Sequence, residues 1–428
     1  MQAGSPGARI YLTPNRIRQL WYPPILGAAL ALMMARMLVM ARVLDVEQFA
    51  QFCGGALVSS TFSMLGCLGL QSLLQREWPV NILRGQEWRG LMRAAQCNLV
   101  AVGCAMVCLL AVLVGRPLAG VAPRLLAIGT LHGLAQQLFL IATVESRSRG
   151  DALRYSHENL TRAVLVLGLG ALVAITTHSA VWTLTTEALI SLALSWRLFG
   201  LSVARGPAQL RRVYWLAARG LGRVNWRSAL TLLAVSGIGF VIMNADRWVA
   251  ADRLDLRGFA HYSFACIVLL VAQALQVVIN ASAYPLLARS FASDGRGGAL
   301  RLSAMLSGIA LVLALVCAVP AWAVLAYAIP RWFPAYSDAV GLLPLFLGVA
   351  LLRVSDFWSS YLLIIGREGR MLALNAGVAI VGVGIWAALV RPWSAPSLPL
   401  HDVALLAVAM AVCGYLAVAG SAIQERRL

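Results

Sequence analysis

The stretch ARVLDVEQFAQF occupies residues 41–52, and it returns later in the chain as ADRLDLRGFAHY at residues 251–262. The two stretches share alanine, leucine, aspartate, phenylalanine and alanine at a constant separation of 210 residues. Each stretch lies where one apolar run ends and the next begins. A recurrence at the same place in each half of the chain predicts an internal duplication.

The apolar runs around these stretches predict a polytopic membrane protein. Of the 428 residues, 60% are hydrophobic and only 12% are charged. Runs of about 20 apolar residues, enough to cross a bilayer as a helix, recur along the chain, and they lack the period-two alternation of a β-barrel. We therefore expect an all-α membrane protein. The twelve expected spans cover residues 20–44, 49–74, 94–115, 118–145, 156–177, 181–204, 228–251, 259–287, 301–328, 338–365, 371–391 and 402–423.

The duplication predicts two six-helix bundles related by a parallel pseudo-two-fold axis, because six spans separate equivalent positions and leave both copies in the same orientation. The linker between them has apolar residues at helical spacing and arginines on its other faces, which predicts an amphipathic helix on the cytoplasmic surface. The expected segments are a cytoplasmic N-terminal segment (1–19), an N-terminal bundle (20–204), the linker (205–227), a C-terminal bundle (228–423) and a cytoplasmic tail (424–428).

The basic charge has a topological meaning. The formal net charge is +18, and all 35 basic residues are arginines. Most of them fall in the short connections between apolar runs, and alternating these connections between two compartments places 23 on one side and 8 on the other. The positive-inside rule makes the richer side cytoplasmic, together with both termini. Because no basic stretch is long enough to form a separate module, we do not expect nucleic-acid binding.

Motifs for catalysis are missing from the sequence. It contains no GxxxxGK[ST], no HExxH and no GxSxG, and the eight cysteines show no metal-ligand spacing. The outer connections are too short for the catalytic loops of a polysaccharide polymerase or a glycosyltransferase. We therefore expect neither an enzyme nor a bound cofactor or metal. His132, within a span, is a candidate for hydrogen bonding between helices or for proton relay.

Charged residues inside the spans are the most informative feature. An arginine at mid-bilayer depth costs about 2.5–3.5 kcal/mol on insertion scales, so such residues face a cavity or pair with one another. Arg353 and Asp356 are three positions apart, which favours a local ion pair. Arg36 has no acidic neighbour at helical spacing, so it requires an anionic ligand or an acid on another helix, such as Asp246 or Glu187. The set consists of Arg36, Arg162, Glu187, Asp246, Arg247, Arg353 and Asp356.

Several stretches resemble one transporter family. Besides ARVLDVEQFAQF, they are GLQSLLQRE at 69–77, NADRWVAADRLDLRGFAHYS at 244–263 and AYPLLARS at 283–290. These are similar to segments of the oligosaccharide-lipid flippases, whose superfamily also holds lipid II flippases and multidrug-and-toxin (MATE) exporters. The resemblance implies a MATE-like fold that moves polyprenyl-pyrophosphate-linked oligosaccharide across a bacterial inner membrane by alternating access, for polysaccharide export. It makes membrane lipid, a polysaccharide polymerase and chain-length machinery candidate partners.

The resemblance also points to individual residues. In lipid II flippases an arginine six positions before the first-turn arginine faces the central cavity, and Arg36 stands six positions before Arg42. Arg76 matches a basic position at the cavity mouth. The alternative is a cation-coupled multidrug exporter of the same fold, which a basic cavity disfavours. The candidate substrate-binding residues are Arg36, Arg76, Arg162, Arg247 and Arg353, and the candidates for coupling to Na⁺ or H⁺ are Asp246, Glu187 and Asp356.

Overall fold

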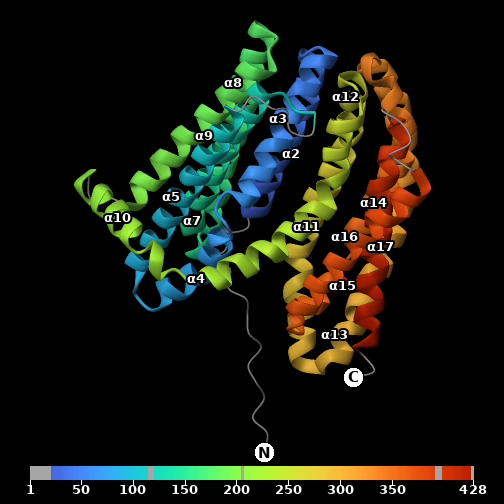
Figure 1. Ribbon diagram of the computed structural model, residues 1–428. Coiled ribbons are helices and arrows are strands. Elements are labelled where there is room, and N and C mark those ends of the chain that lie inside the picture. Colours follow the sequence, from blue (N-terminus) through green and yellow to red (C-terminus); the bar gives the residue numbers. More distant parts are fainter. Residues whose placement is uncertain (1–20, 114–119, 204–206, 391–397, 426–428) are drawn as a thin grey trace, which may run out of the picture.

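The fold consists of helices arranged as two bundles side by side (Figure 1). The computed structural model describes residues 21–113, 120–203, 207–390 and 398–425, and within these ranges it contains helices and no strand. The predicted segment 1–19 and the last residues of the predicted tail lie outside the described residues. The all-α prediction is confirmed for the part of the chain that the structure describes.

The first half of the chain builds the N-terminal bundle and a connecting helix. Its helices are α2 (Tyr22–Val43), α3 (Val46–Leu65), α4 (Leu70–Leu83), α5 (Glu87–Val112), α6 (Pro123–Ala142), α7 (Val144–Ser148), α8 (Ala152–Thr177) and α9 (Ala180–Val203). The connection follows as α10 (Pro207–Arg219) and a 3-10 turn, η1 (Leu221–Arg223). Val213, Ala217 and Val224 of the predicted apolar face are buried.

The second half builds the C-terminal bundle. Its elements are α11 (Trp226–Arg253), α12 (Leu256–Ala265), α13 (Ile267–Trp332), η2 (Pro334–Leu342), α14 (Leu343–Val354), α15 (Trp358–Ile364), α16 (Glu368–Val390) and α17 (Leu400–Gln424). Within α13, Gly295 adopts φ 68° and ψ −160°, so the chain reverses there. The positive φ suits glycine, which has no Cβ to clash. This one long element therefore contains most of the eighth predicted span and all of the ninth.

The repeated stretches form the same helix–turn–helix junction in both halves. Asp45 caps α3 by accepting a 2.7 Å hydrogen bond from the Gln48 amide, and Asp255 caps α12 through a 2.9 Å bond from the Gly258 amide. The φ and ψ angles are −67° and 167° at Asp45, and −68° and 168° at Asp255. An aspartate at an N-cap satisfies an otherwise unpaired amide of the first helical turn. The sequence duplication is thus a structural one at this junction.

The helices of the two halves also pack in the same order. In the N-terminal bundle α2 packs on α8, α3 packs on α6, and α9 packs on both α6 and α8. In the C-terminal bundle α11 packs on α16, α13 packs on α14, and α17 packs on both α14 and α16. The pairings of α11 with α16 and of α17 with α14 and α16 join the helices six spans further along the chain. Because α13 carries both the eighth and the ninth spans, its packing on α14 corresponds to that of α3 and α5 on α6. This is the packing that a duplicated bundle requires.

Ten or eleven of the twelve predicted spans meet the length and hydropathy of a membrane-spanning helix among the described residues. Each of the twelve predicted ranges overlaps a described helix; ten described helices are long and apolar enough to cross a membrane, or eleven if the bent pair α3–α4 counts as one span. α9 stands outside that number. The α3–α4 pair bends by 52°, because Leu68 and Gly69 both have positive φ. A side chain at Gly69 would overlap the Ala229 carbonyl of α11, so glycine lets the two halves approach here.

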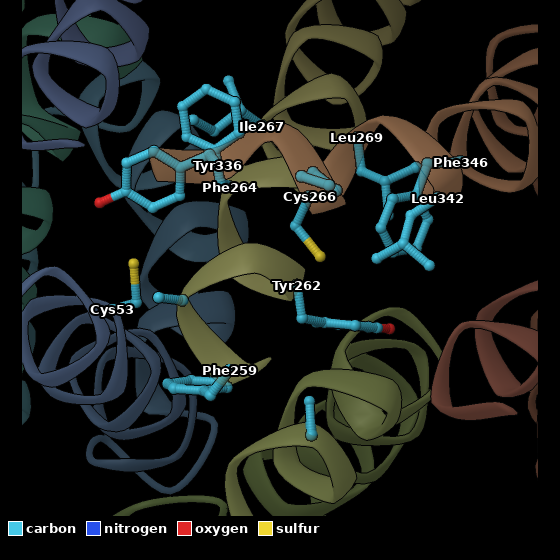
Figure 2. Close-up of a cluster of buried hydrophobic side chains, with 14 of the residues drawn as sticks. Cys53, Phe259, Tyr262, Phe264, Cys266, Ile267, Leu269, Tyr336, Leu342 and Phe346 are labelled. Atoms are coloured by element: carbon cyan, nitrogen blue, oxygen red, sulfur yellow. The ribbon is translucent and has the colours of Figure 1, made fainter. Parts of the chain in front are cut away.

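Aromatic side chains close the two bundles against each other beside the repeated junction. Figure 2 shows this part of the core around Tyr262, Phe264 and Tyr336. Tyr336 of η2 stacks on Phe264 with ring centroids 4.6 Å apart, and it meets Phe49 of α3 edge-on at 5.3 Å. Phe49 belongs to the first repeated stretch and Phe264 follows the second. The duplicated sequence therefore builds part of the contact between the halves.

Candidate functional site

A cavity of about 400 Å³ lies between the two bundles. Residues of α2, α3 and α6 line it from the N-terminal half, and residues of α11, α12 and α13 line it from the C-terminal half. Its charged side chains are Arg36 from α2 and Arg247 from α11, and none of its described lining residues is an aspartate or glutamate. We call this space the central cavity. Its walls present positive charge to whatever enters.

Arg36 both lines the central cavity and pairs with an acid behind it. Its Nε atom lies 2.9 Å from Oε1 of Glu187 on α9, whose side chain is fully buried. The Arg36 guanidinium carbon also lies 5.0 Å from the centroid of the Phe52 ring. Of the two acids that the sequence offered as partners, Glu187 is the one in contact. Arg36 can therefore form an ion pair with Glu187 and still face a ligand in the central cavity.

Glu187 has a second partner, His132 of α6. The His132 Nε2 atom lies 3.3 Å from Glu187 Oε2, and its Nδ1 atom lies 2.6 Å from the Ser59 hydroxyl of α3. Both His132 and Ser59 line the central cavity. The expected interhelical hydrogen bond of His132 is present, but its link to Glu187 and Arg36 appears only once α2, α3, α6 and α9 are packed together. Arg36, Ser59, His132 and Glu187 form a connected set of contacts that we call the Glu187 network.

Arg162 lies behind this network. It is buried, its Nε donates to the Ser191 hydroxyl at 3.1 Å, and its guanidinium carbon lies 4.9 Å from the Phe139 ring centroid. It is not among the residues that line the central cavity. Arg162 therefore adds positive charge near Glu187 and Arg36 without meeting the cavity itself.

Arg247 is the cavity residue with the most unused hydrogen-bonding capacity. Its Nε and Nη2 atoms are buried and have no hydrogen-bond partner, and no carboxylate forms an ion pair with it among the described residues. The neighbouring carboxylate of Asp246 turns elsewhere and accepts a 2.6 Å hydrogen bond from the Tyr262 hydroxyl. The Cys266 thiol is the polar group that meets Arg247, and a buried guanidinium with unfilled donors is costly unless an anion or water meets it. Arg247 is thus ready to bind an anion.

Arg353 and Asp356 do not form the local ion pair that their spacing favours. α14 ends at Val354 and α15 begins at Trp358, so the two residues do not share a helical face. Asp356 instead accepts hydrogen bonds from the Ser359 amide at 3.1 Å and the Ser359 hydroxyl at 2.6 Å, in the first turn of α15. Arg353 and Asp356 line a separate pocket of about 190 Å³ in the C-terminal bundle. Neither residue lines the central cavity.

Arg76 also lies apart from the central cavity. Its Nη2 donates to the Ser228 hydroxyl of α11 at 3.2 Å, and its side chain lines a different pocket between α4, α5 and α10. Among the described residues no group of three or more histidines, cysteines or acids could hold a metal ion. Of the five candidate arginines, the structure brings Arg36 and Arg247 together in one cavity.

Among the comparisons with known proteins, only solved structures resemble the chain, and they identify its fold. No protein-family model and no curated protein matches the chain. A solved structure described as the inward-facing conformation of a multidrug resistance MATE family transporter of the MOP superfamily aligns with 96% of this chain and 97% of its own, with a TM-score of 0.57 and 12% identity. The chain has the MATE fold. The outward-facing conformation of such a transporter aligns with a TM-score of 0.54 and 15% identity over 96% of this chain and 94% of its own.

Another structure with the MATE fold comes from Vibrio cholerae. It is the crystal structure of a mutant MATE transporter, and it aligns with 96% of this chain and 96% of its own, with a TM-score of 0.55 and 13% identity. The predicted MATE-like architecture is thereby confirmed over nearly the whole chain, and the apolar helices make it a multi-pass membrane protein. At these identities the likeness is one of fold, and the resemblance to oligosaccharide-lipid flippases remains a prediction.

Proposed function

We propose that the chain is a flippase for polyprenyl-pyrophosphate-linked oligosaccharide in a bacterial inner membrane, working by alternating access. The supporting observation is that the central cavity presents Arg36 and Arg247, one from each bundle, and no described carboxylate. Guanidinium groups offer planar, paired donors that match phosphate oxygens. The lipid of such a substrate stays in the bilayer, so the cavity has to accept only the anionic head and its sugars.

The position of the two arginines suits alternating access. In transporters built from repeats, one bundle rocks against the other around a site between them. A pyrophosphate bound by Arg36 and Arg247 would contact both bundles, so its binding would favour their approach. With the cytoplasm negative, outward movement of an anion gains about 2.3 kcal/mol per charge per 100 mV. In this proposal both termini face the cytoplasm, and a polymerase with chain-length machinery receives the exported oligosaccharide.

The Glu187 network offers a means of coupling transport to protons. Glu187 holds Arg36 at 2.9 Å, so the carboxylate and an incoming pyrophosphate compete for the same guanidinium. A proton on Glu187 would free Arg36 to bind the substrate, so the proton would bind and leave together with the substrate. A sodium ion near Glu187 would act in the same direction. Asp246 is the other buried carboxylate next to a cavity arginine, and Asp356 is occupied by its hydrogen bonds from Ser359.

The second candidate function is cation-coupled multidrug export. Two of the aligned structures are described as multidrug resistance transporters, and the fold is equally compatible with that activity. A cationic drug needs acidic or aromatic groups facing it. In the central cavity the nearby acid, Glu187, is paired with Arg36, so the local charge favours an anion.

The test is transport by the purified protein in lipid vesicles. A fluorescent polyprenyl-pyrophosphate oligosaccharide is placed in one leaflet, and its appearance in the other is followed with a membrane-impermeant quencher. We expect movement by the unaltered protein and at least a ten-fold slower rate for Arg247→Ala, because the cavity guanidinium with unfilled donors is lost. The matched control is Arg257→Ala, an exposed arginine of the same half, which should keep the full rate.

The result also separates the two candidate functions. Organic cations are offered to the same vesicles in parallel. Cation transport without movement of the lipid-linked substrate would establish the multidrug exporter in place of the flippase. Movement of the lipid-linked substrate at an unchanged rate by Arg247→Ala would overturn the role assigned to the central cavity.

A further inference from the structure

A second and larger cavity, of about 770 Å³, lies between α4, α5, α10 and η1 in the N-terminal half. It is separate from the central cavity and shares no lining residue with it. Six arginines line it, against one acid, Glu77. We call it the basic pocket. Its arginines are Arg76, Arg84, Arg89, Arg93, Arg219 and Arg223.

Most of this positive charge is not neutralised by the protein. The Glu77 carboxylate accepts a 3.1 Å bond from the Arg93 Nε, and no other lining arginine has an ion pair among the described residues. Arg76 and Arg89 bond to uncharged side chains, those of Ser228 and Gln86. Like charges gathered in one pocket repel one another, so an anionic ligand there relieves a cost already present in the fold.

The walls of the basic pocket are held in place by specific contacts. Gln96 of α5 accepts a 2.9 Å bond from Arg93 and donates a 3.3 Å bond to the Ala217 carbonyl of α10. Nearby, the Asn98 amide donates to the Tyr214 hydroxyl at 2.9 Å. These bonds fix α10 against α5, so the arginines of both helices face a pocket of defined shape.

The rim of the basic pocket has the composition of a membrane interface. Trp215 of α10 is 51% exposed, and the Arg219 guanidinium stacks over its ring at 3.7 Å. On α4, Leu83 is 89% exposed beside Arg84. Tryptophan and arginine alternating with exposed apolar side chains are typical of the boundary between lipid head groups and acyl chains.

We propose that the basic pocket binds the phosphate head group of an anionic phospholipid of the cytoplasmic leaflet. Arginine clusters on the cytoplasmic side recognise such head groups, and guanidinium forks match phosphate oxygens. α10 leads through η1 directly into α11 of the C-terminal bundle. A bound lipid therefore holds the connection between the two bundles. This inference is independent of what the central cavity transports.

The experiment measures lipid binding to the detergent-purified full chain. Thermal unfolding is recorded while phosphatidylglycerol is titrated, with phosphatidylcholine as the uncharged reference and inorganic pyrophosphate as the soluble phosphate. The test variant is Arg84→Gln/Arg219→Gln/Arg223→Gln. The matched control is Arg289→Gln/Arg296→Gln/Arg301→Gln, which removes the same charge from exposed arginines outside the pocket, predicted to lie on the same side of the membrane.

We expect phosphatidylglycerol to raise the unfolding temperature of the unaltered protein and of the control variant. The test variant should bind this lipid about 100-fold more weakly, since each arginine near the surface contributes about a five-fold gain in affinity. Equal binding by the test and control variants would overturn the assigned site. An equal response to phosphatidylcholine, or a response to pyrophosphate that the test variant loses, would overturn the assignment to an anionic phospholipid.

Discussion

At the scale of single residues, the central cavity depends on how each buried arginine is compensated. Arg36 has Glu187 at 2.9 Å, and Glu187 also faces His132. Arg247 has no carboxylate in ion-pair contact among the described residues. Removing one member of a buried pair leaves the other charge uncompensated and costs about 3–5 kcal/mol. Arg36 and Arg247 should therefore respond differently to mutation.

This difference gives a prediction for Arg36. Arg36→Ala should abolish flipping and also lower the amount of folded protein, because Glu187 loses its cation. The double variant Arg36→Ala/Glu187→Gln should restore the amount of protein but not flipping, since no buried charge remains unpaired while the phosphate ligand is still missing. Arg36→Lys should retain part of the activity, because an ammonium keeps the charge but loses the paired donors.

The measurements for Arg36 are membrane abundance and flipping rate in the same vesicles. Full flipping by the double variant would show that Arg36 only balances Glu187 and does not bind substrate. The sequence offered Arg36 an anionic ligand or an acid on another helix, such as Asp246 or Glu187, and the choice depends on how α2, α8 and α9 pack. Arg353 and Asp356 illustrate the opposite case. Their spacing favours an ion pair on one helix, but the chain breaks between α14 and α15, so Arg353 and Asp356 do not lie on a common helix and the ion pair does not form.

At the scale of elements, the repeated junction is the best-determined part of the fold. Asp45 and Asp255 cap α3 and α12 with nearly the same backbone angles. The sequence predicted this equivalence because the capping aspartate and the buried phenylalanine recur together. It did not predict the bend of 52° between α3 and α4. That bend comes from the positive φ of Leu68 and Gly69, at a point where Gly69 lies against the Ala229 carbonyl of α11, far away in the sequence.

The two caps should contribute similarly to stability. Asp45→Ala and Asp255→Ala should each lower the free energy of unfolding by about 1 kcal/mol, the usual effect of losing an N-cap side chain. Asp45→Asn and Asp255→Asn are the controls, since asparagine also caps a helix. Thermal unfolding of the purified variants in detergent gives the comparison. A large loss at one junction with none at the other would contradict the structural equivalence of the repeats.

At the scale of the whole molecule, the duplication explains both the architecture and the position of the cavity. Two copies of one packing order enclose a space that neither copy forms alone, and each copy supplies one arginine to it. The repeat, the apolar runs and the arginine asymmetry predicted the fold class. Which arginines face the shared space was not predictable from them, because Arg162 and Arg353 have the same hydropathic setting as Arg36 and differ only in the direction they face.

Orientation in the membrane is the remaining prediction at this scale. The placement of 23 arginines on one side and 8 on the other puts the exposed Arg84 in the cytoplasm and the exposed Ser337 outside. In a variant lacking the eight native cysteines, Ser337→Cys should react with a membrane-impermeant maleimide in intact cells. Arg84→Cys should react only after the cells are permeabilised. Labelling of Arg84→Cys in intact cells would reverse the orientation, and with it the leaflet from which the basic pocket takes its lipid.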